Sequence, residues 1–477
     1  MYRMLVEEEH EPNNDELFHI LDQFLETSPC SLLLRGEPGQ GKTTFVLEFM
    51  RRYREKYRGY YVSTRVSLEK LEMQFGWAKG LLKKESVLEA EQSPKQELKG
   101  FDARIGRARN LTEIVTNAAL GDSALVVLDS WDTLAKETPF DERAKTERMI
   151  TTIADAHNSL IIFVGEEDEY SRNSAYLVDG IITLSLDSID SVKIRRCTID
   201  KMRGTSIPRQ DLLYTLDNSR FEILPKLRMI DYSAPGRFEP SKLRDGFFSS
   251  GNRDLDNILG GIRKGSVVLI ETAQDAIRFS LDLLLSGFIL NALSNKNDAI
   301  VVNSPDTPSK ASLALIRPFI HNDLLKNLRV FTHQEDTKES NVIEFGENES
   351  ENYKLLSKEY GTLKGSKKGG GQTVMTFDVG LNEIRKLEEA NFWKSKLIDL
   401  SRSVRENGDL LILSNRTGLD ATPLSKTISD VHPQIFSKAG THFVRVQKPS
   451  IDGPTILFAL AVDQKKRYPA YVLKRVV

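Results

Sequence analysis

The chain has few of the residues that build disulfide-bonded or metal-held folds. Its 477 residues include two cysteines, Cys30 and Cys197, which exclude a disulfide scaffold and a cysteine-based metal site. Its seven histidines show no ligand spacing. No apolar run approaches the roughly 18 residues that a membrane span needs. Residues 1–9 contain no signal-peptide core. We therefore expect a cytoplasmic protein in a reducing compartment, with no membrane partner.

The charge balance gives little support to a nucleic-acid partner. The formal net charge is −2, so no overall basic field attracts DNA, although a local basic patch stays open. The hydrophobic share of 40% and the charged share of 28% are ordinary for a globular protein. A chain of this length exceeds one hydrophobic core, so about two to three domains are expected.

Apolar patterning in the first half predicts a parallel sheet covered by helices. Residues 15–26 carry apolar side chains at helical spacing, which predicts an amphipathic helix. Several later apolar runs are nearly continuous, as in strands buried on both faces. Residues 83–110 are charged and weakly patterned, so we expect a solvated, partly helical insertion. The expected strands are residues 31–35, 59–63, 124–129, 159–165, 180–184, 193–202 and 211–216.

A second series of strands follows a change in composition. The pattern dissolves around Pro235 and Pro240, which indicates a linker. The polar residues 334–372 predict a mobile loop without a specific role. We predict an α/β protein with two tandem domains, each a mostly parallel twisted sheet flanked by helices, at residues 1–227 and 250–477, joined by a linker over residues 228–249. The second-half strands are expected at residues 266–271, 299–303, 328–332, 373–378, 410–414, 441–447 and 454–463.

A phosphate-binding loop follows the first expected strand. It reads Gly36-Glu37-Pro38-Gly39-Gln40-Gly41-Lys42-Thr43, and Thr44 continues into a helix. Successive backbone N–H groups and a helix N-terminus in such a loop face a triphosphate. Lys42 would reach the β- and γ-phosphates, and the Thr43 hydroxyl would take a Mg²⁺ position. We therefore predict ATP and Mg²⁺ here. The alternative is a glycine-rich turn that matches the pattern by chance.

An acid ends a later buried strand and completes a Walker B arrangement. The strand reads Leu125-Val126-Val127-Leu128-Asp129-Ser130. The carboxyl ends of parallel strands form the edge where open α/β sheets bind ligands. We expect Asp129 to hold the Mg²⁺ shell and Ser130 to support it.

Two further clusters of charged residues have both a functional interpretation and an alternative in which they are ordinary surface residues. Glu166 and Glu167 follow the next strand, where one of them could orient a water for hydrolysis; an acidic solvated turn is the equal alternative. Lys201 and Arg203 lie two residues apart on a late strand, so strand alternation sends both to one face. They could clamp phosphates of a neighbouring subunit. A solvent-facing basic pair on an edge strand is the alternative.

The order of these motifs resembles the RecA superfamily, and within it the KaiC-like and RadA-like ATPases. The stretch from Tyr176 to Ile182, followed by Lys201-Met202-Arg203-Gly204-Thr205-Ser206, looks like the end of a KaiC domain. This resemblance covers residues 20–225. It implies two RecA-like P-loop NTPase domains in tandem, and it implies that Lys201 and Arg203 reach the nucleotide of an adjacent protomer. The segment from Phe24 to Gly36 also looks like archaeal P-loop regulators of the gas-vesicle D type.

Both halves depart from the KaiC pattern. The second half repeats the lead-in to a phosphate loop, but Ile277 stands where the lysine should be and Arg278 where the Mg²⁺ hydroxyl should be. An apolar side chain cannot neutralise a triphosphate, so we expect a degenerate domain that serves interaction or assembly, with Asp378 as a relic Walker B acid. The first half lacks the glutamate pair after the second strand, and Arg65 there cannot act as a general base.

The sequence therefore predicts an ATP-binding regulatory ATPase of the KaiC/RadA type, with slow conversion of ATP to ADP and phosphate. We expect a homo-oligomer, either a ring or a dimer, and a protein partner for the second domain. One alternative is a recombination or repair ATPase that binds DNA, for which the basic runs at residues 104–109 and 364–368 are the support. The other is a module that holds ATP without turnover.

Overall fold

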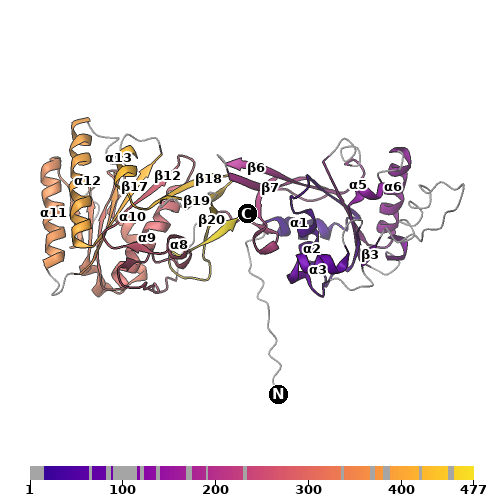
Figure 1. Ribbon diagram of the computed structural model, residues 1–477, viewed down its shortest axis with the longest axis horizontal. Helices are drawn as coiled ribbons and strands as arrows, with labels where there is room; N and C mark the ends of the chain where they lie inside the picture. Colours follow the sequence, from indigo (N-terminus) through magenta and orange to yellow (C-terminus); the bar gives the residue numbers. More distant parts are fainter. Residues whose placement is uncertain are drawn as a thin grey trace, which may run out of the picture. The chain divides into compact units, whose positions relative to one another are not determined.

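The computed structural model describes most of the chain and divides it into two compact units (Figure 1). Unit 1 is Met1–Leu224 with Val476–Val477, and unit 2 is Pro225–Arg475. The described residues are 16–63, 67–81, 87–89, 115–118, 123–135, 140–167, 175–189, 192–228, 234–334, 338–365, 371–379, 387–417, 422–448 and 456–477. None of the described helices combines the length and the apolar character that crossing a membrane requires.

Unit 1 is built on a nine-stranded sheet with the order β3-β2-β4-β5-β1-β6-β7-β8-β9. The strands from β3 to β6 pair in parallel, and β6 to β9 pair antiparallel. The strands are β1 Ser31–Gly36, β2 Arg58–Ser63, β3 Val87–Glu89, β4 Ala124–Asp129, β5 Leu160–Gly165, β6 Gly180–Ile189, β7 Val192–Met202, β8 Asp211–Thr215 and β9 Glu222–Ile223. The helices are α1 Glu16–Glu26, α2 Lys42–Arg52, α3 Leu68–Gln74, α5 Trp131–Ala135 and α6 Phe140–Ala156.

The parallel strands of unit 1 are buried on both faces. Alternate residues of β1 belong to different cores: Leu32 and Leu34 pack with α1 and α2, whereas Leu33 packs in the core that contains Ile150 of α6. Figure 1 shows α1 and α2 together and α6 apart from them in this unit. This two-sided burial explains why the strands appear in the sequence as continuous apolar runs.

Unit 2 repeats the arrangement on a ten-stranded sheet, with the order β15-β14-β13-β16-β17-β12-β18-β19-β20-β21. Its strands are β12 Val267–Thr272, β13 Asp298–Val302, β14 Leu328–Thr332, β15 Val342–Glu344, β16 Thr373–Asp378, β17 Leu410–Arg416, β18 His432–Lys438, β19 Thr441–Lys448, β20 Leu457–Val462 and β21 Tyr471–Val476, and a small hairpin joins β10 Phe247–Phe248 to β11 Ile262–Arg263. Its helices are α8 Arg253–Leu259, α9 Arg278–Ser294, α10 Ser309–Ala314, α11 Glu349–Gly365, α12 Leu387–Asn407 and α13 Thr422–Ile428.

The second sheet is also covered on both faces. Val268 and Ile270 of β12 pack with α9, whereas Val267 and Leu269 pack with α11 and α12. Figure 1 shows α11 and α12 side by side along this unit. The predicted fold class is therefore confirmed: two mostly parallel sheets, each flanked by helices.

Three expectations about irregular segments need correction or comment. Residues 87–89, inside the expected partly helical insertion, form β3 beside β2, while most of that insertion lies outside the described residues. The expected mobile loop over 334–372 contains β15 and α11 instead, because Leu356 and Leu363 of α11 reach the core. Within the expected linker, residues 229–233 lie outside the described part, and Phe238 is buried in unit 2 and donates its amide to Phe319 O at 2.8 Å.

The predicted domain limits at residues 227 and 250 stay a prediction. Elsewhere the predicted strands of both halves are confirmed to within a few residues. In unit 2, β15, β18, β21 and the short β10–β11 hairpin were not predicted, because none of these strands carries the long apolar run that marks the buried strands.

Candidate functional site

The phosphate loop joins the carboxyl end of β1 to the start of α2. β1 lies between β5 and β6, in parallel with both, so the loop leaves the middle of the sheet. Two positions in the loop require glycine. A Cβ atom on Gly36 would lie 2.4 Å from the carbonyl oxygen of Leu184, and Gly41 has a φ of 81° immediately before α2. The first N–H groups of α2 have no partner within the helix, so they can face an anion.

Polar contacts from outside the predicted motif hold the loop. The hydroxyl of Tyr214 on β8 donates to Gln40 O at 2.5 Å, and the guanidinium of Arg195 on β7 donates to Gly39 O at 3.0 Å. The Gln40 side chain accepts the Glu37 amide at 3.1 Å. Sequence reasoning missed Arg195 and Tyr214, because no local pattern tells which residues of β7 and β8 cross to a loop that lies 156 and 174 positions earlier.

Lys42 is directed back over the loop that precedes it. Its ammonium group donates to Gly36 O and, at 3.1 Å, to Glu37 O. The side chain is half-buried, and Thr44 behind it is buried. The positive charge therefore lies inside the curve of the loop, where the predicted phosphates would be.

Thr43 and Asp129 meet at the same edge of the sheet. The Thr43 hydroxyl donates to Asp129 Oδ2 at 2.9 Å, although the two residues are 86 positions apart in the sequence. Asp129 ends β4, and Ser130 beyond it is buried, with its Oγ 2.7 Å from the hydroxyl of Thr133. The peptide bond between Asp129 and Ser130 is cis. The structure thus joins the two predicted metal ligands.

These two oxygens fit Mg²⁺, which prefers hard oxygen ligands and keeps several waters. The described residues contain no cluster of three or more His, Cys, Asp or Glu side chains that could hold a metal alone. Other Mg²⁺ sites use one or two protein ligands together with waters and phosphate oxygens, and the pair Thr43 and Asp129 fits that pattern.

A tyrosine that was not predicted completes this corner. The Tyr61 hydroxyl on β2 donates to the same Asp129 Oδ2 at 2.5 Å. Burial, and next the Asp129 charge, raise the pKa of Tyr61 well above its ordinary value, so the phenol stays protonated and acts as a donor. The signal in the sequence was a tyrosine in a strand of the parallel sheet, because a phenol that is buried there needs a hydrogen-bond partner.

The predicted catalytic glutamates directly follow β5 at this edge of the sheet. β5 pairs with β4 so that Val164 lies beside Asp129, and Glu166 follows two residues later. The Glu166 amide donates to Asp132 Oδ2 at 2.5 Å, and Asp132 pairs with Arg143 at 3.0 Å. Glu166 is partly exposed and Glu167 is exposed. Their catalytic role stays a prediction, and Arg65 lies outside the described residues.

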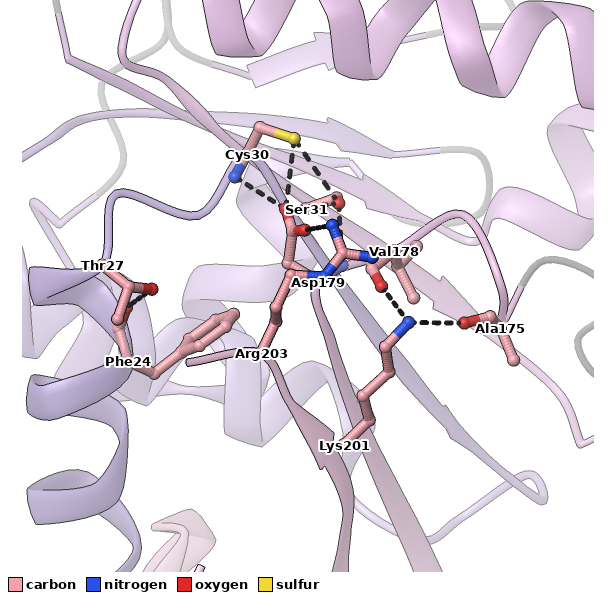
Figure 2. Close-up of polar contacts among 9 residues, drawn as sticks. All are labelled: Phe24, Thr27, Cys30, Ser31, Ala175, Val178, Asp179, Lys201 and Arg203. Carbon is pink, nitrogen blue, oxygen red and sulfur yellow. Dashed lines mark hydrogen bonds and ion pairs between the residues drawn. The ribbon is translucent and has the colours of Figure 1, made fainter. Parts of the chain in front are cut away.

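Lys201 and Arg203 lie at the other end of β1 (Figure 2). Gly180 pairs with Leu32 and with Met202, which places both basic residues beside the start of β1. Five steps of about 3.3 Å along the strand put this cluster roughly 16 Å from the loop at the end of β1. The structure therefore does not bring Lys201 and Arg203 to the phosphate loop of their own chain.

Asp179 is the centre of that cluster (Figure 2). Arg203 pairs with Asp179 at 2.9 Å, and its side chain is 63% exposed. Lys201 donates to Ala175 O at 3.1 Å and to Val178 O at 2.6 Å. Burial and the contact with Asp179 raise the pKa of Cys30 to about 11, so this thiol stays protonated. Burial, followed by the Arg203 charge, lowers the pKa of Lys201.

The corresponding corner of unit 2 has an ion pair where unit 1 has the Thr43–Asp129 contact. Arg278 opens α9 and pairs with Asp378 at 3.0 Å and with Asp282 at 2.8 Å. Burial raises the pKa of the Asp282 carboxyl, and the nearby Arg278 charge offsets only part of this rise. Ile277 is 44% exposed, and its amide donates to His442 at 3.2 Å. A guanidinium thus lies beside the acid that ends β16.

A second substitution in this corner concerns the penultimate residue of β12. Glu271 replaces the first glycine of the loop and is 0% exposed. It lies 2.9 Å from His432 and 3.1 Å from Lys426. Burial alone would raise the pKa of Glu271, but the hydrogen bonds from His432 and Lys426 outweigh it and hold the pKa below its ordinary value.

Unit 1 thus has the defining features of a P-loop nucleotide-binding domain: a parallel sheet, a glycine-rich loop with an enclosed lysine, and a Thr–Asp pair at the same edge. Residues 19–228 match the protein-family model described as ATPase: KaiC. Residues 19–228 therefore carry a KaiC-like ATPase domain of the RecA superfamily, as the sequence motifs predicted.

Three relatives extend the comparison. Protein GvpD1 of Halobacterium salinarum is 28% identical over 308 residues, which cover 62% of this chain and 56% of that protein. Protein GvpD2 of the same organism is 26% identical over 309 residues, covering 62% and 61%. UPF0273 protein PH0284 of Pyrococcus horikoshii is 29% identical over 191 residues, covering 37% and 77%. The matches span little more than half the length of the two GvpD proteins. The predicted resemblance to the gas-vesicle D type is confirmed.

Proposed function

We propose that this protein is a regulatory ATPase in which unit 1 binds Mg²⁺ and ATP and unit 2 has lost the nucleotide site. The observation that carries this proposal is the contact between Thr43 and Asp129 at 2.9 Å, beside the enclosed ammonium group of Lys42. A cation and two metal-binding oxygens at one helix N-terminus suit a triphosphate and its metal.

Each residue of the site has a distinct task in this proposal. Backbone amides of residues 36–44 bind the phosphates, and Lys42 neutralises the β- and γ-phosphates. Thr43 and Asp129 hold the metal, and the Ser130 hydroxyl supports the Asp129 end of the strand. When bound there, Mg²⁺ would reduce the negative charge that develops on the phosphate oxygens. Arg195 and Tyr214 keep the loop in shape.

Hydrolysis is proposed to be slow. The sequence has no acid directly after β2, and the acids available at the sheet edge are Glu166 and Glu167. We propose that one of them orients the attacking water. Efficient general-base catalysis needs a group within about 3 Å of the proton that it takes, directly or through one water. The partial exposure of Glu166 and the exposure of Glu167 favour a low rate.

The remaining elements of the proposal concern assembly. Lys201 and Arg203 lie too far from their own loop to bind its nucleotide, and Arg203 is exposed, which supports a role toward a neighbouring protomer in a ring or dimer. Unit 2, with Arg278 beside Asp378, would bind a protein partner instead of ATP. The similarity to the GvpD proteins supports a regulatory role. A cytoplasmic location remains part of the proposal.

The test is a titration with a fluorescent ATP analogue. Lys42→Ala should abolish binding, because it removes the ammonium group that the loop encloses. Lys193→Ala, which changes an exposed lysine of the same unit, is the matched control and should bind as the unaltered protein does. Undiminished affinity in Lys42→Ala would refute the assignment of the site.

A module that holds ATP without turnover is the second candidate. The lack of an acid in Thr64-Arg65-Val66 favours it. A phosphate-release assay separates the two: release that Glu166→Gln or Glu167→Gln reduces supports the ATPase, and release no faster than in Lys42→Ala supports the module. DNA binding is not part of the proposal, because the net charge is −2 and the run at residues 104–109 lies outside the described part.

A further inference from the structure

Tyr61 links the second strand of unit 1 to the metal corner. It lies on β2, opposite Val127 of β4, and its side chain is 2% exposed. Its ring packs in the core formed with α1 and α2, whereas Tyr60 and Val62 belong to the core on the opposite face. The only part of Tyr61 that needs a polar partner is its hydroxyl, and that hydroxyl donates to Asp129 Oδ2 at 2.5 Å.

Two donors from different elements converge on one carboxylate oxygen. Thr43 Oγ1 on α2 and Tyr61 Oη on β2 both donate to Asp129 Oδ2. Two donors on one oxygen fix the rotation of the carboxylate about its Cβ–Cγ bond. Because the Tyr61 side chain is itself buried, it holds this orientation even if Thr43 turns toward a metal.

We propose that Tyr61 is a positioning residue that holds Asp129 in the orientation needed for Mg²⁺ and thereby couples metal binding to nucleotide binding. This inference rests on the function proposed above. Hydrogen-bond partners of metal-binding carboxylates typically affect metal affinity about 10–100-fold. Tyr61 touches neither phosphate nor reacting atoms in this scheme, so its effect should depend on Mg²⁺.

The experiment measures the affinity for a fluorescent ATP analogue as a function of Mg²⁺ concentration, with an EDTA series as the metal-free reference. Tyr61→Phe keeps the ring and removes the hydroxyl. We expect the nucleotide affinity in EDTA to be unchanged. The Mg²⁺ concentration that gives half of the metal-dependent gain in nucleotide affinity should rise by at least about 10-fold. Tyr60→Phe removes a phenol from the other face of the same strand and should match the unaltered protein.

Two results would overturn the inference. One is an unchanged Mg²⁺ midpoint in Tyr61→Phe. The other is an equal loss of affinity in EDTA and in Mg²⁺, which would make Tyr61 a packing residue only. Should Tyr61→Phe fail to fold, Tyr61→Met gives the same comparison, since it lacks the hydroxyl and adapts to the buried space. The proposed function fails separately, if Lys42→Ala binds nucleotide as tightly as the unaltered chain.

Discussion

Replacing Arg278 with Met should destabilise unit 2 although it leaves the hydrophobic core intact. Arg278 lies between Asp378 at 3.0 Å and Asp282 at 2.8 Å, so its removal leaves two carboxylates without the cation between them. The side chains of Asp378 and Asp282 are 13% and 26% exposed, and that of Arg278 is 39% exposed. The arrangement is therefore intermediate between a surface pair and a buried pair.

The expected loss follows from that intermediate burial. Surface ion pairs contribute about 0–1 kcal/mol, and breaking a buried pair costs about 3–5 kcal/mol. We therefore expect the free energy of unfolding of unit 2 to fall by about 2 kcal/mol at neutral pH. For a domain of this size each kcal/mol lowers the melting temperature by about 2–4 °C, which predicts a shift of about 4–8 °C.

A double-mutant cycle with Arg278→Met, Asp378→Asn and the combined variant isolates the pair, with thermal unfolding as the assay. The stability deficit of Arg278→Met should shrink as the pH falls, because burial raises the pKa of Asp282 and protonation of this carboxyl removes its repulsion with Asp378. Arg317→Met, which breaks the pair with Glu339 by changing a 51% exposed arginine, is the control and should cost less than about 1 kcal/mol. A coupling energy below about 0.5 kcal/mol would refute the reasoning.

Three further outcomes follow from the described contacts. Arg195→Ala should weaken ATP binding about 3–10-fold in the fluorescence titration, because it removes a donor to Gly39 O worth about 1 kcal/mol. Glu271→Gln should flatten the pH dependence of unfolding below about pH 4.5. The depressed pKa of Glu271 stabilises the folded state at pH values above its ordinary pKa, and this stabilisation is lost as the pH falls through the pKa of the folded state. A pH profile of urea unfolding that Glu271→Gln leaves unchanged would contradict this. Arg203→Ala should leave ATP affinity at low protein concentration unchanged and abolish any ATP-dependent gain in mass by light scattering.

The parallel strands were predictable from the sequence because burial on both faces leaves a plain signal. The side chains of β1 point alternately into two cores, with Leu32 and Leu34 in one core and Leu33 in the other. Because both cores are hydrophobic, every one of these positions is apolar. The loop and Asp129 were predictable for a related reason: phosphate and metal chemistry restricts the residue types near the strand ends.

Other parts of the site depended on tertiary contacts that have no local signature. Tyr61, Arg195 and Tyr214 act through single hydrogen bonds to residues far away in the sequence. The helix α11 was predicted to be a loop, because it buries only a narrow set of side chains, such as Leu356 and Leu363, among many polar ones. The sequence placed Arg278 at the metal position but did not reveal that its charge pairs with Asp378.

The location of the basic residues at the opposite end of β1 has a consequence for symmetry. If Lys201 and Arg203 serve the loop of a neighbour, the two surfaces that meet are different ones, and each copy offers one of each. A two-fold dimer makes this contact twice, once in each direction, whereas a head-to-tail assembly adds copies in a single direction. A closed circle then supplies every loop with a basic pair, whereas an open row leaves its last loop without one.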